Sequence, residues 1–428
     1  NKKGRAAALA IAFGRPQIIL PPKYIRWIID QPESVLSMDP IHDEFHAFVQ
    51  DGLVGDHSVQ EVLRKELTHN LGRLTADIND EIVDALHAVW GDSPEWRTIP
   101  LKDSTRTIIA RITNRLFVGK ELCRNEQYIR DAVGLGLAVM PETVFQDLLP
   151  RPLKGPVSAI VKWINRFYMA GFNRHLQSVV RQRIHDRAVR RGEPMAGLEQ
   201  RTIARVGMAN LASIETTTNT MSKCLADLTT LGEAQGYRAL VTAEARTVLR
   251  ECQQRPEKKD IDKLGCIENA LKESLRLAVV FPGLIRQVTS PTGATLAADK
   301  EAGGLRLPHG ARISVAAYAI HRDDSLWPEA TTYNPSRYEV EHAAAPRVPM
   351  SRASERFLSF GMGKRACPGR FFVTDELKLL FAHIFTKYEI KVIPPPPTTA
   401  GLFTELTLRG PQEQLMIRRR TEEEMNTA

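Results

Sequence analysis

The chain has 428 residues, 43% of them hydrophobic, so it can bury a large core in one big domain or in two or three smaller ones. Its net charge of +8 at pH 7 indicates a basic surface, but lysine and arginine are scattered without an aromatic-plus-basic repeat, which argues against nucleic-acid binding. An acidic protein partner or an anionic membrane surface explains this charge better.

The cysteine pattern argues against a disulfide framework or a zinc site. There are five cysteines, an odd number, and none of them forms a CxxC pair, so we expect a reducing, cytosol-facing environment. No apolar run approaches the ~18 residues of a membrane span. Because the sequence starts at Asn1, directly before a strand-like segment, we expect a missing N-terminal piece, with a membrane anchor as the candidate.

The first half of the chain is predicted to be mostly helical. Residues 6–13 and 17–20 are typical of two strands around a turn at 14–16, and Pro21-Pro22 opens a helix over 23–30. Residues 38–57 are irregular and suit a loop over a pocket. From Val59 the apolar spacing is helical, and further helices are expected at about 77–90, 102–118 and 126–140.

The second half contains the longest expected helices and most of the expected strands. Prolines break the helical pattern over 148–156, before a long helix at about 157–190 and a short connector at 190–195. A helix rich in threonine and small residues follows over 200–231. The other expected helices cover 235–255 and 260–277, and the strands 284–289, 305–308, 311–317, 388–393 and 402–418.

A loop near the C-terminus presents one cysteine and then runs into a helix over 370–387. A thiolate at a helix N-terminus is favoured by free backbone N–H groups and by the helix dipole. Gly363 and Gly369 would let the backbone approach something large and flat, where a Cβ would collide. The combination suits a cysteine, Cys367, that ligates a haem iron; a buried structural cysteine is the alternative.

This loop resembles the haem-binding loop of the cytochrome P450 family, F-x-x-G-x-R-x-C-x-G, at Phe360, Gly363, Arg365, Cys367 and Gly369. The resemblance implies the P450 fold, mainly α with a minor β portion, as a single catalytic domain over residues 1–428. It further implies that haem b lies between the threonine-rich helix and the loop, with the Cys367 thiolate on iron and Arg365 on a propionate.

A second motif is the pair Glu273 and Arg276, which are three residues apart and therefore neighbours on a helix. Alone this spacing is a weak signal, because solvated surface pairs are common. Residues 333–338 resemble the family's later F-x-P-x-R-F segment and supply Arg337. By resemblance, Glu273, Arg276 and Arg337 form a buried structural network beneath the cysteine loop.

A third motif, Ala212-Ser213-Ile214-Glu215-Thr216-Thr217, lies within the threonine-rich helix. A threonine hydroxyl can bond the carbonyl one turn back and open the helix, and an acid beside an alcohol can relay protons. The motif resembles the family's A-G-x-D/E-T-T, with Ser213 where glycine is usual. The resemblance puts Ala212 beside the haem and assigns Glu215 and Thr216 to proton delivery; an incidental polar helix face is the alternative.

Haem propionates need cations. Arg286 lies ten residues after Arg276, the spacing at which the family has a second propionate arginine. The family's earlier W-x-x-x-R is absent, and His69 and Arg73 are substitutes that the sequence does not rank. A plain surface charge is the alternative for each of them. We interpret His321 as a core residue.

The substrate and the electron donor are inferred from the resemblance. It assigns substrate contacts to five apolar residues, which suit a hydrophobic small molecule but equally suit core packing: Val279, Val280, Phe281, Leu284 and Phe403. No glycine-rich phosphate loop follows a strand. We therefore expect NADPH electrons to arrive from NADPH-cytochrome P450 reductase, with cytochrome b5 as a second donor, docked on a basic face.

The sequence around Cys367 is similar to that of fungal microsomal family members of secondary metabolism. This implies a haem-thiolate monooxygenase that uses O2 to oxidise a hydrophobic metabolite at the cytosolic face of the endoplasmic reticulum membrane. One alternative is a P450-fold enzyme of oxidative coupling, desaturation or rearrangement, which product analysis would distinguish. Another is a haem-binding sensor or carrier without turnover, against which the Glu215–Thr216 pair argues.

Overall fold

The computed structural model of the chain describes residues 6–9, 16–42, 57–148, 151–191, 198–279, 283–296, 304–339, 347–394 and 413–426. Helices make up most of this part of the chain, and its strands form three small sheets. The molecule is therefore mainly α with a minor β portion, as the sequence predicts.

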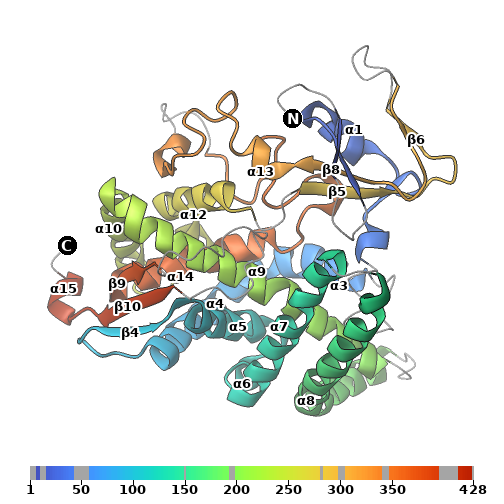
Figure 1. Ribbon diagram of the computed structural model, residues 1–428. Coiled ribbons are helices and arrows are strands. Elements are labelled where there is room, and N and C mark those ends of the chain that lie inside the picture. Colours follow the sequence, from blue (N-terminus) through green and yellow to red (C-terminus); the bar gives the residue numbers. More distant parts are fainter. Residues whose placement is uncertain are drawn as a thin grey trace.

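The largest sheet lies at the upper right of Figure 1, close to the N-terminus. Its strand order is β1-β2-β8-β5-β3, with the strands Ala7–Leu9, Gln17–Ile19, Arg312–Ala316, Gly283–Val288 and Leu36–Ser37. Only β2 and β8 pair in parallel. Because side chains alternate along a strand, β5 buries Leu284, Arg286 and Val288 on one face. An arginine is thus buried among apolar residues.

The first half of the chain adds a short helical segment beside this sheet and a group of longer helices. These elements are η1 Pro22–Tyr24, α1 Ile25–Asp30, α3 Ser58–Val62, the π-helical η3 Leu63–Leu67, α4 Thr68–Trp90, α5 Leu101–Phe117, α6 Lys120–Cys123, α7 Glu126–Leu148 and α8 Arg151–Arg191. Residues 58–90 run without the break expected before residue 77, because no proline interrupts them and the π-helical turn keeps the backbone bonded.

The second half contains α9 Leu198–Ala234, which crosses the middle of the molecule with α12 on one side and α5 on the other (Figure 1). The remaining helical elements are α10 Tyr237–Glu251, α11 Lys258–Lys263, α12 Gly265–Leu277, α13 Ala317–Ile320, η4 Pro335–Tyr338, η5 Gly363–Arg365, α14 Arg370–Lys387 and α15 Glu422–Asn426. One hydrophobic core joins α4, α5, α9, α10, α12 and α14.

Two further sheets complete the described fold. Strands β4 Arg97–Pro100, β10 Gln414–Arg419 and β9 Tyr388–Ile393 form an antiparallel sheet in the order β4-β10-β9. A two-stranded ribbon pairs β6 Ala294–Thr295 with β7 Arg306–Leu307. The sequence did not predict β3, β4 or β6, because each is short and forms through pairing with another strand rather than through a local pattern.

The break expected over 148–156 is shorter in the structure. Helix α8 begins at Arg151 and contains Pro156. Pro152 falls in the first turn, where proline is tolerated, and Pro156 costs one further backbone hydrogen bond. Four expected features lie wholly or mostly outside the described residues: most of the turn at 14–16, most of the 38–57 loop, residues 192–195 and the start of the 402–418 strand.

Candidate functional site

The cysteine loop is a tight backbone turn that ends at the start of α14. The Cys367 N–H donates to the Phe360 carbonyl at 2.8 Å. Gly363 has a φ of +77°, and a Cβ there would lie 3.0 Å from the Cβ of Ile29 on α1, so both backbone shape and packing require glycine. Gly369 is different, because its φ is −85° and no described protein atom lies within 4 Å of an added Cβ. Protein contacts alone do not explain that glycine.

The Cys367 thiol is half-buried at the N-terminus of α14. Burial raises its pKa, whereas backbone hydrogen bonds from Gly369 and Arg370 and the Arg370 charge lower it. Such donors stabilise a thiolate, and a bound metal ion would deprotonate the thiol outright. Cys123 has no comparable backbone donors, and burial raises its pKa to about 12. The surroundings of Cys367 are therefore those of a ligating sulfur.

Three cations line a cavity of about 30 Å³ next to the loop, namely Arg286, Lys364 and Arg365. Arg365 donates from Nε to Glu33 Oε1 at 2.8 Å, and its Nη2 lies 2.7 Å from Asp39 Oδ1. These two contacts fix the plane of the guanidinium. Arg365 therefore stands at the point where the cysteine loop meets the segment after α1.

Arg286 is buried without a direct ion pair among the described residues. It is 5% exposed, and it donates from Nη1 to the carbonyl of the preceding residue at 2.7 Å. Burial lowers its pKa, and the nearby charge of Glu33 opposes that effect in part. Because a buried cation without a hydrogen-bonded anion is costly, this arginine suits an anionic ligand.

The residues around the loop fit a haem by their charge. Arg64, which the sequence analysis did not single out, donates from Nη2 to the Lys364 carbonyl at 3.1 Å. Cations outnumber carboxylates near the loop, with Arg64, Arg286, Lys364 and Arg365 against Glu33 and Asp39, and this excess of positive charge suits the anionic propionates of a haem.

The two substitutes from the sequence analysis lie further along the same helical run. His69 is exposed, and its Nδ1 contacts the carbonyl of Lys65 at 2.5 Å, whereas Arg73 is exposed on α4. No described contact joins either residue to the cysteine loop. The family's W-x-x-x-R pattern is absent from this chain, so no motif marks Arg64. Arg64 also lies five residues before His69, a spacing that the α-helical period of 3.6 residues does not select.

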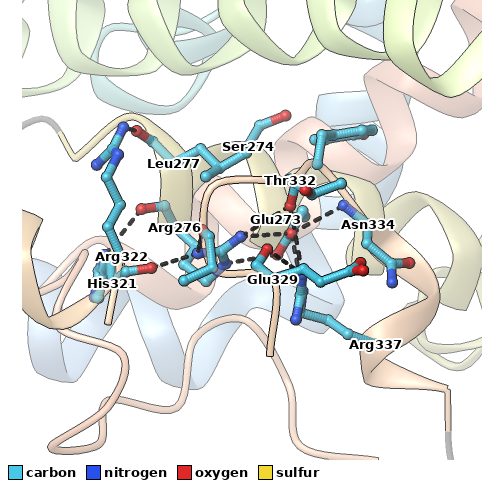
Figure 2. A network of polar contacts seen from close by, with 12 residues as sticks. Glu273, Ser274, Arg276, Leu277, His321, Arg322, Glu329, Thr332, Asn334 and Arg337 are labelled. Carbon is cyan, nitrogen blue, oxygen red and sulfur yellow. Dashed lines mark hydrogen bonds and ion pairs between the residues drawn. The ribbon is translucent and has the colours of Figure 1, made fainter. Parts of the chain in front are cut away.

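Glu273 is the centre of the network drawn in Figure 2. Its two carboxylate oxygens accept from Arg276 Nη2 at 2.7 Å and from Arg276 Nε at 2.9 Å, and Arg337 Nε donates to it at 2.9 Å. The Asn334 N–H and the Tyr338 hydroxyl each donate to it at 3.0 Å. A buried carboxylate is thus surrounded by donors.

The two arginines of this network use their other N–H groups on backbone carbonyls. Arg276 donates to His321, to Ala330 at 2.5 Å and to Thr332 at 3.2 Å, and Arg337 donates to Pro328 at 2.9 Å. Figure 2 shows these contacts joining α12 to the segment before η4. The network is closed on itself, as a structural lock requires.

His321 is a core residue, as expected. Its Nδ1 contacts the Arg276 carbonyl at 3.1 Å, and its Nε2 accepts from the Leu358 N–H at 2.9 Å. Burial lowers its pKa to about 4, so the imidazole is neutral at pH 7. Both ring nitrogens are used, which leaves none for a metal.

Thr216 lies on the face of α9 that also carries Ala212 and Ser213. Its hydroxyl donates to the Ala212 carbonyl at 2.8 Å, and the Ser213 hydroxyl donates to Ala209 at 2.6 Å. These are the one-turn-back bonds that loosen a helix. Ala212 is exposed and the other two are half-buried, so this face is the most open part of the middle of α9.

Glu215 faces a different neighbour from Thr216. Its carboxylate accepts from Arg106 Nε on α5 at 2.5 Å, and both side chains are 8% exposed. Arg106 also donates to Asp103 at 2.5 Å. Two further polar contacts follow the same helix pair, from Thr105 to Ser222 and from Asn114 to Asn210. No described hydrogen bond joins Glu215 to Thr216.

The predicted substrate residues are only partly within the described chain. Val279 and Leu284 are buried in the hydrophobic cluster beneath the largest sheet. Val280, Phe281 and Phe403 lie outside the described residues. The described geometry thus gives core packing for two of the five and leaves the substrate assignment a prediction.

Comparisons with known proteins point to the same family as these motifs. The family profile described as cytochrome P450 matches residues 176–415. The chain is 65% identical over 439 residues to the cytochrome P450 monooxygenase ecdH of Aspergillus rugulosus, covering 98% of this chain and 85% of that protein. It is 48% identical over 449 residues to the cytochrome P450 monooxygenase gloO of Glarea lozoyensis, with the same coverage. The chain therefore belongs to the cytochrome P450 family of monooxygenases.

Proposed function

We propose that the chain oxidises a hydrophobic small molecule of fungal secondary metabolism with haem b, which the Cys367 thiolate would hold. The observation that carries this proposal is the Cys367 sulfur at the N-terminus of α14, acted on by the backbone N–H groups of Gly369 and Arg370. The fungal relatives support the source of the substrate. One core from Leu71 to Ile417 supports a single catalytic domain over residues 1–428.

When bound, haem supplies the iron at which dioxygen is reduced and activated. Its propionates would be held by Arg286, Arg365 and Arg64, because these residues lie near the loop, where cations outnumber carboxylates. Phe360 would support the loop through its carbonyl, which holds the Cys367 N–H. The open space at Gly369 supports a close approach of the flat ring.

Thr216 and Glu215 would guide protons from different faces of α9. The Thr216 hydroxyl on the open face would orient water, while Glu215 would have to separate from Arg106 before it could deliver a proton. We expect Thr216→Ala to raise NADPH consumption relative to product, with Thr220→Ala one turn away as the control. Unchanged coupling in Thr216→Ala would remove this residue from the relay.

The ligand assignment is tested by the reduced, CO-bound spectrum of the purified protein. We expect the thiolate-dependent red shift of the Soret band in the wild type and its loss in Cys367→His. A wild-type spectrum without that shift would reject Cys367 as the ligand. Product analysis with NADPH and reductase then distinguishes hydroxylation from coupling, desaturation or rearrangement.

Electrons would come from NADPH-cytochrome P450 reductase, with cytochrome b5 as a second donor. The net charge of +8 and the exposed Arg64 and Lys364 next to the cysteine loop support an acidic partner surface. The rate of the first electron transfer should then fall as ionic strength rises. A rate that is independent of salt would contradict charge-guided docking.

Attachment to the cytosolic face of the endoplasmic reticulum membrane belongs to the same proposal. Within the described chain no helix combines the length and hydropathy of a membrane span. Support comes from α8, where four large apolar side chains spaced along one stripe are 51–72% exposed: Leu153, Ile160, Trp163 and Phe167. Such a stripe on a basic helix suits an anionic bilayer surface.

The membrane proposal is tested with vesicles of phosphatidylserine and phosphatidylcholine. We expect Trp163→Ser with Phe167→Ser to weaken binding of this chain to the vesicles. Leu240→Ser on α10 is the matched control, because Leu240 is 51% exposed outside α8. Equal loss of binding in both variants would show that the α8 stripe has no special role.

A further inference from the structure

The segment after α1 forms a small bracket of acceptors around Arg365. Glu33 receives the Arg365 Nε at 2.8 Å through one carboxylate oxygen and the Ser37 hydroxyl at 2.6 Å through the other. The Ser37 hydroxyl oxygen in turn accepts the Asp39 N–H at 3.0 Å, and Asp39 pairs with Arg365 Nη2 at 2.7 Å. We call Glu33, Ser37 and Asp39 the carboxylate bracket.

The bracket is fixed to the sheet that carries the second arginine. Ser37 lies on β3, where it pairs with Gln287 on β5, the residue directly after Arg286. The Glu33 carbonyl accepts the Thr289 hydroxyl at 2.8 Å. The position of the bracket therefore does not depend on Arg365.

Electrostatics explain why a carboxylate is needed at this point. Arg286 and Arg365 line the same cavity, and each disfavours the positive charge of the other. Glu33 interacts with both, and their guanidinium groups lower its pKa against the opposing effect of burial. Without Glu33 two like charges would face each other beside the loop.

We propose that Glu33 and Asp39 are positioning residues for haem capture, which hold Arg365 in a fixed plane and shield it from Arg286 before a propionate binds. This inference rests on the proposed haem site. The bracket takes Nε and Nη2 of the guanidinium, and Nη1 has no described hydrogen-bond partner. Nη1 is therefore the donor available to a propionate. A guanidinium that is already oriented loses less conformational entropy when a propionate binds than a freely rotating one does.

The opposite role, competition with the propionates for Arg365, makes the opposite prediction. If the carboxylates occupied the donors that a propionate needs, their removal would strengthen haem binding. If they orient the guanidinium, their removal weakens it. The direction of change in haem retention therefore decides between the two roles.

The experiment measures haem transfer from the purified holoprotein to excess apomyoglobin, followed by absorbance. We expect Glu33→Gln and Asp39→Asn each to accelerate transfer, roughly tenfold for a residue that orients a ligand contact. Glu355→Gln is the matched control, since Glu355 pairs with Arg26 of α1 and, like Glu33, is 45% exposed. That control should stay within about twofold of the wild type.

A double-mutant cycle tests whether Glu33 acts through Arg365. In an Arg365→Lys background the guanidinium is already absent, so Glu33→Gln should add little to the transfer rate. The proposal is overturned if Glu33→Gln slows transfer, if its effect is undiminished in that background, or if Glu355→Gln matches it. A wild-type protein without the thiolate spectrum would instead overturn the haem site itself.

Discussion

Two charged clusters lie near the cysteine loop, and they balance their charge differently. Around Glu273, the carboxylate and the guanidinium groups of Arg276 and Arg337 all have partners within the protein, including backbone carbonyls that accept from the two arginines. Around the cavity beside Arg286, cations outnumber carboxylates and one buried guanidinium has no ion pair among the described residues.

The difference separates a cluster that is satisfied within the protein from one that suits the proposed anionic ligand. In a closed network the polar groups already bond to one another, so no donor or acceptor remains to bind a ligand. An unbalanced cluster is unfavourable in the protein alone and becomes favourable when an opposite charge arrives. Both clusters combine arginines with carboxylates, and each contains a buried arginine, Arg276 or Arg286, so charge balance is the useful criterion.

The largest effect should come from Glu273→Gln. The amide cannot balance two guanidinium groups, and breaking a buried network of this kind costs about 5 kcal/mol. We expect a large drop in the free energy of unfolding, measured with urea, and a low yield of folded protein. Glu355→Gln, at an exposed ion pair, should change it by less than about 1 kcal/mol. Equal stability of the two variants would show that the Glu273 network is not a lock.

Much of this fold was readable from the sequence, for reasons that particular residues make clear. The helix Arg370–Lys387 was predicted at its observed bounds, because Pro368 and Gly369 mark its start and apolar residues continue through it. The Glu273–Arg276 pair followed from helical spacing. Such features are local, and local patterns specify them.

Contacts between distant segments were not readable in the same way. Glu215 was predicted from its neighbour Thr216, but its ion pair with Arg106 depends on how α5 packs on α9. Glu33 and Asp39 follow α1 without any motif, and only the fold brings them to Arg365. Arg64 was not predicted, because the W-x-x-x-R pattern that marks such an arginine in the family is absent from this chain. These partners are set by tertiary packing, which periodicity does not encode.

A third buried acidic group extends the comparison, because it belongs neither to the closed network around Glu273 nor to the cation cluster around Arg286. Glu376 on α14 is fully buried, its Oε1 lies 3.5 Å from the Thr113 hydroxyl, and its Oε2 has no hydrogen-bond partner in the described structure. Burial raises its pKa from 4.5 to about 8. This carboxyl therefore stays protonated at neutral pH, which avoids an uncompensated buried charge.

The raised pKa of Glu376 predicts a loss of stability at alkaline pH. Between pH 4.5 and about 8 the folded protein holds a proton that the unfolded chain releases, so rising pH favours unfolding across that window. The contribution is on the order of 5 kcal/mol. Glu376→Gln should lose this part of the pH dependence and be more stable than the wild type at pH 9. Parallel stability profiles from pH 5 to 9 would contradict a neutral Glu376.

The smallest of the three effects, and the one that most directly tests the comparison, is expected from Arg286→Met. If the cation cluster is built for an anionic ligand, removing its unpaired member should leave the fold intact, because a buried charge is replaced by an apolar side chain of similar length. Haem transfer to apomyoglobin should nevertheless accelerate roughly tenfold, or about 1.4 kcal/mol. Arg286→Lys should lie between this variant and the wild type, since lysine keeps the charge but loses the fork. A drop in unfolding free energy as large as that of Glu273→Gln would instead make Arg286 a structural residue, and charge balance would then fail as a criterion.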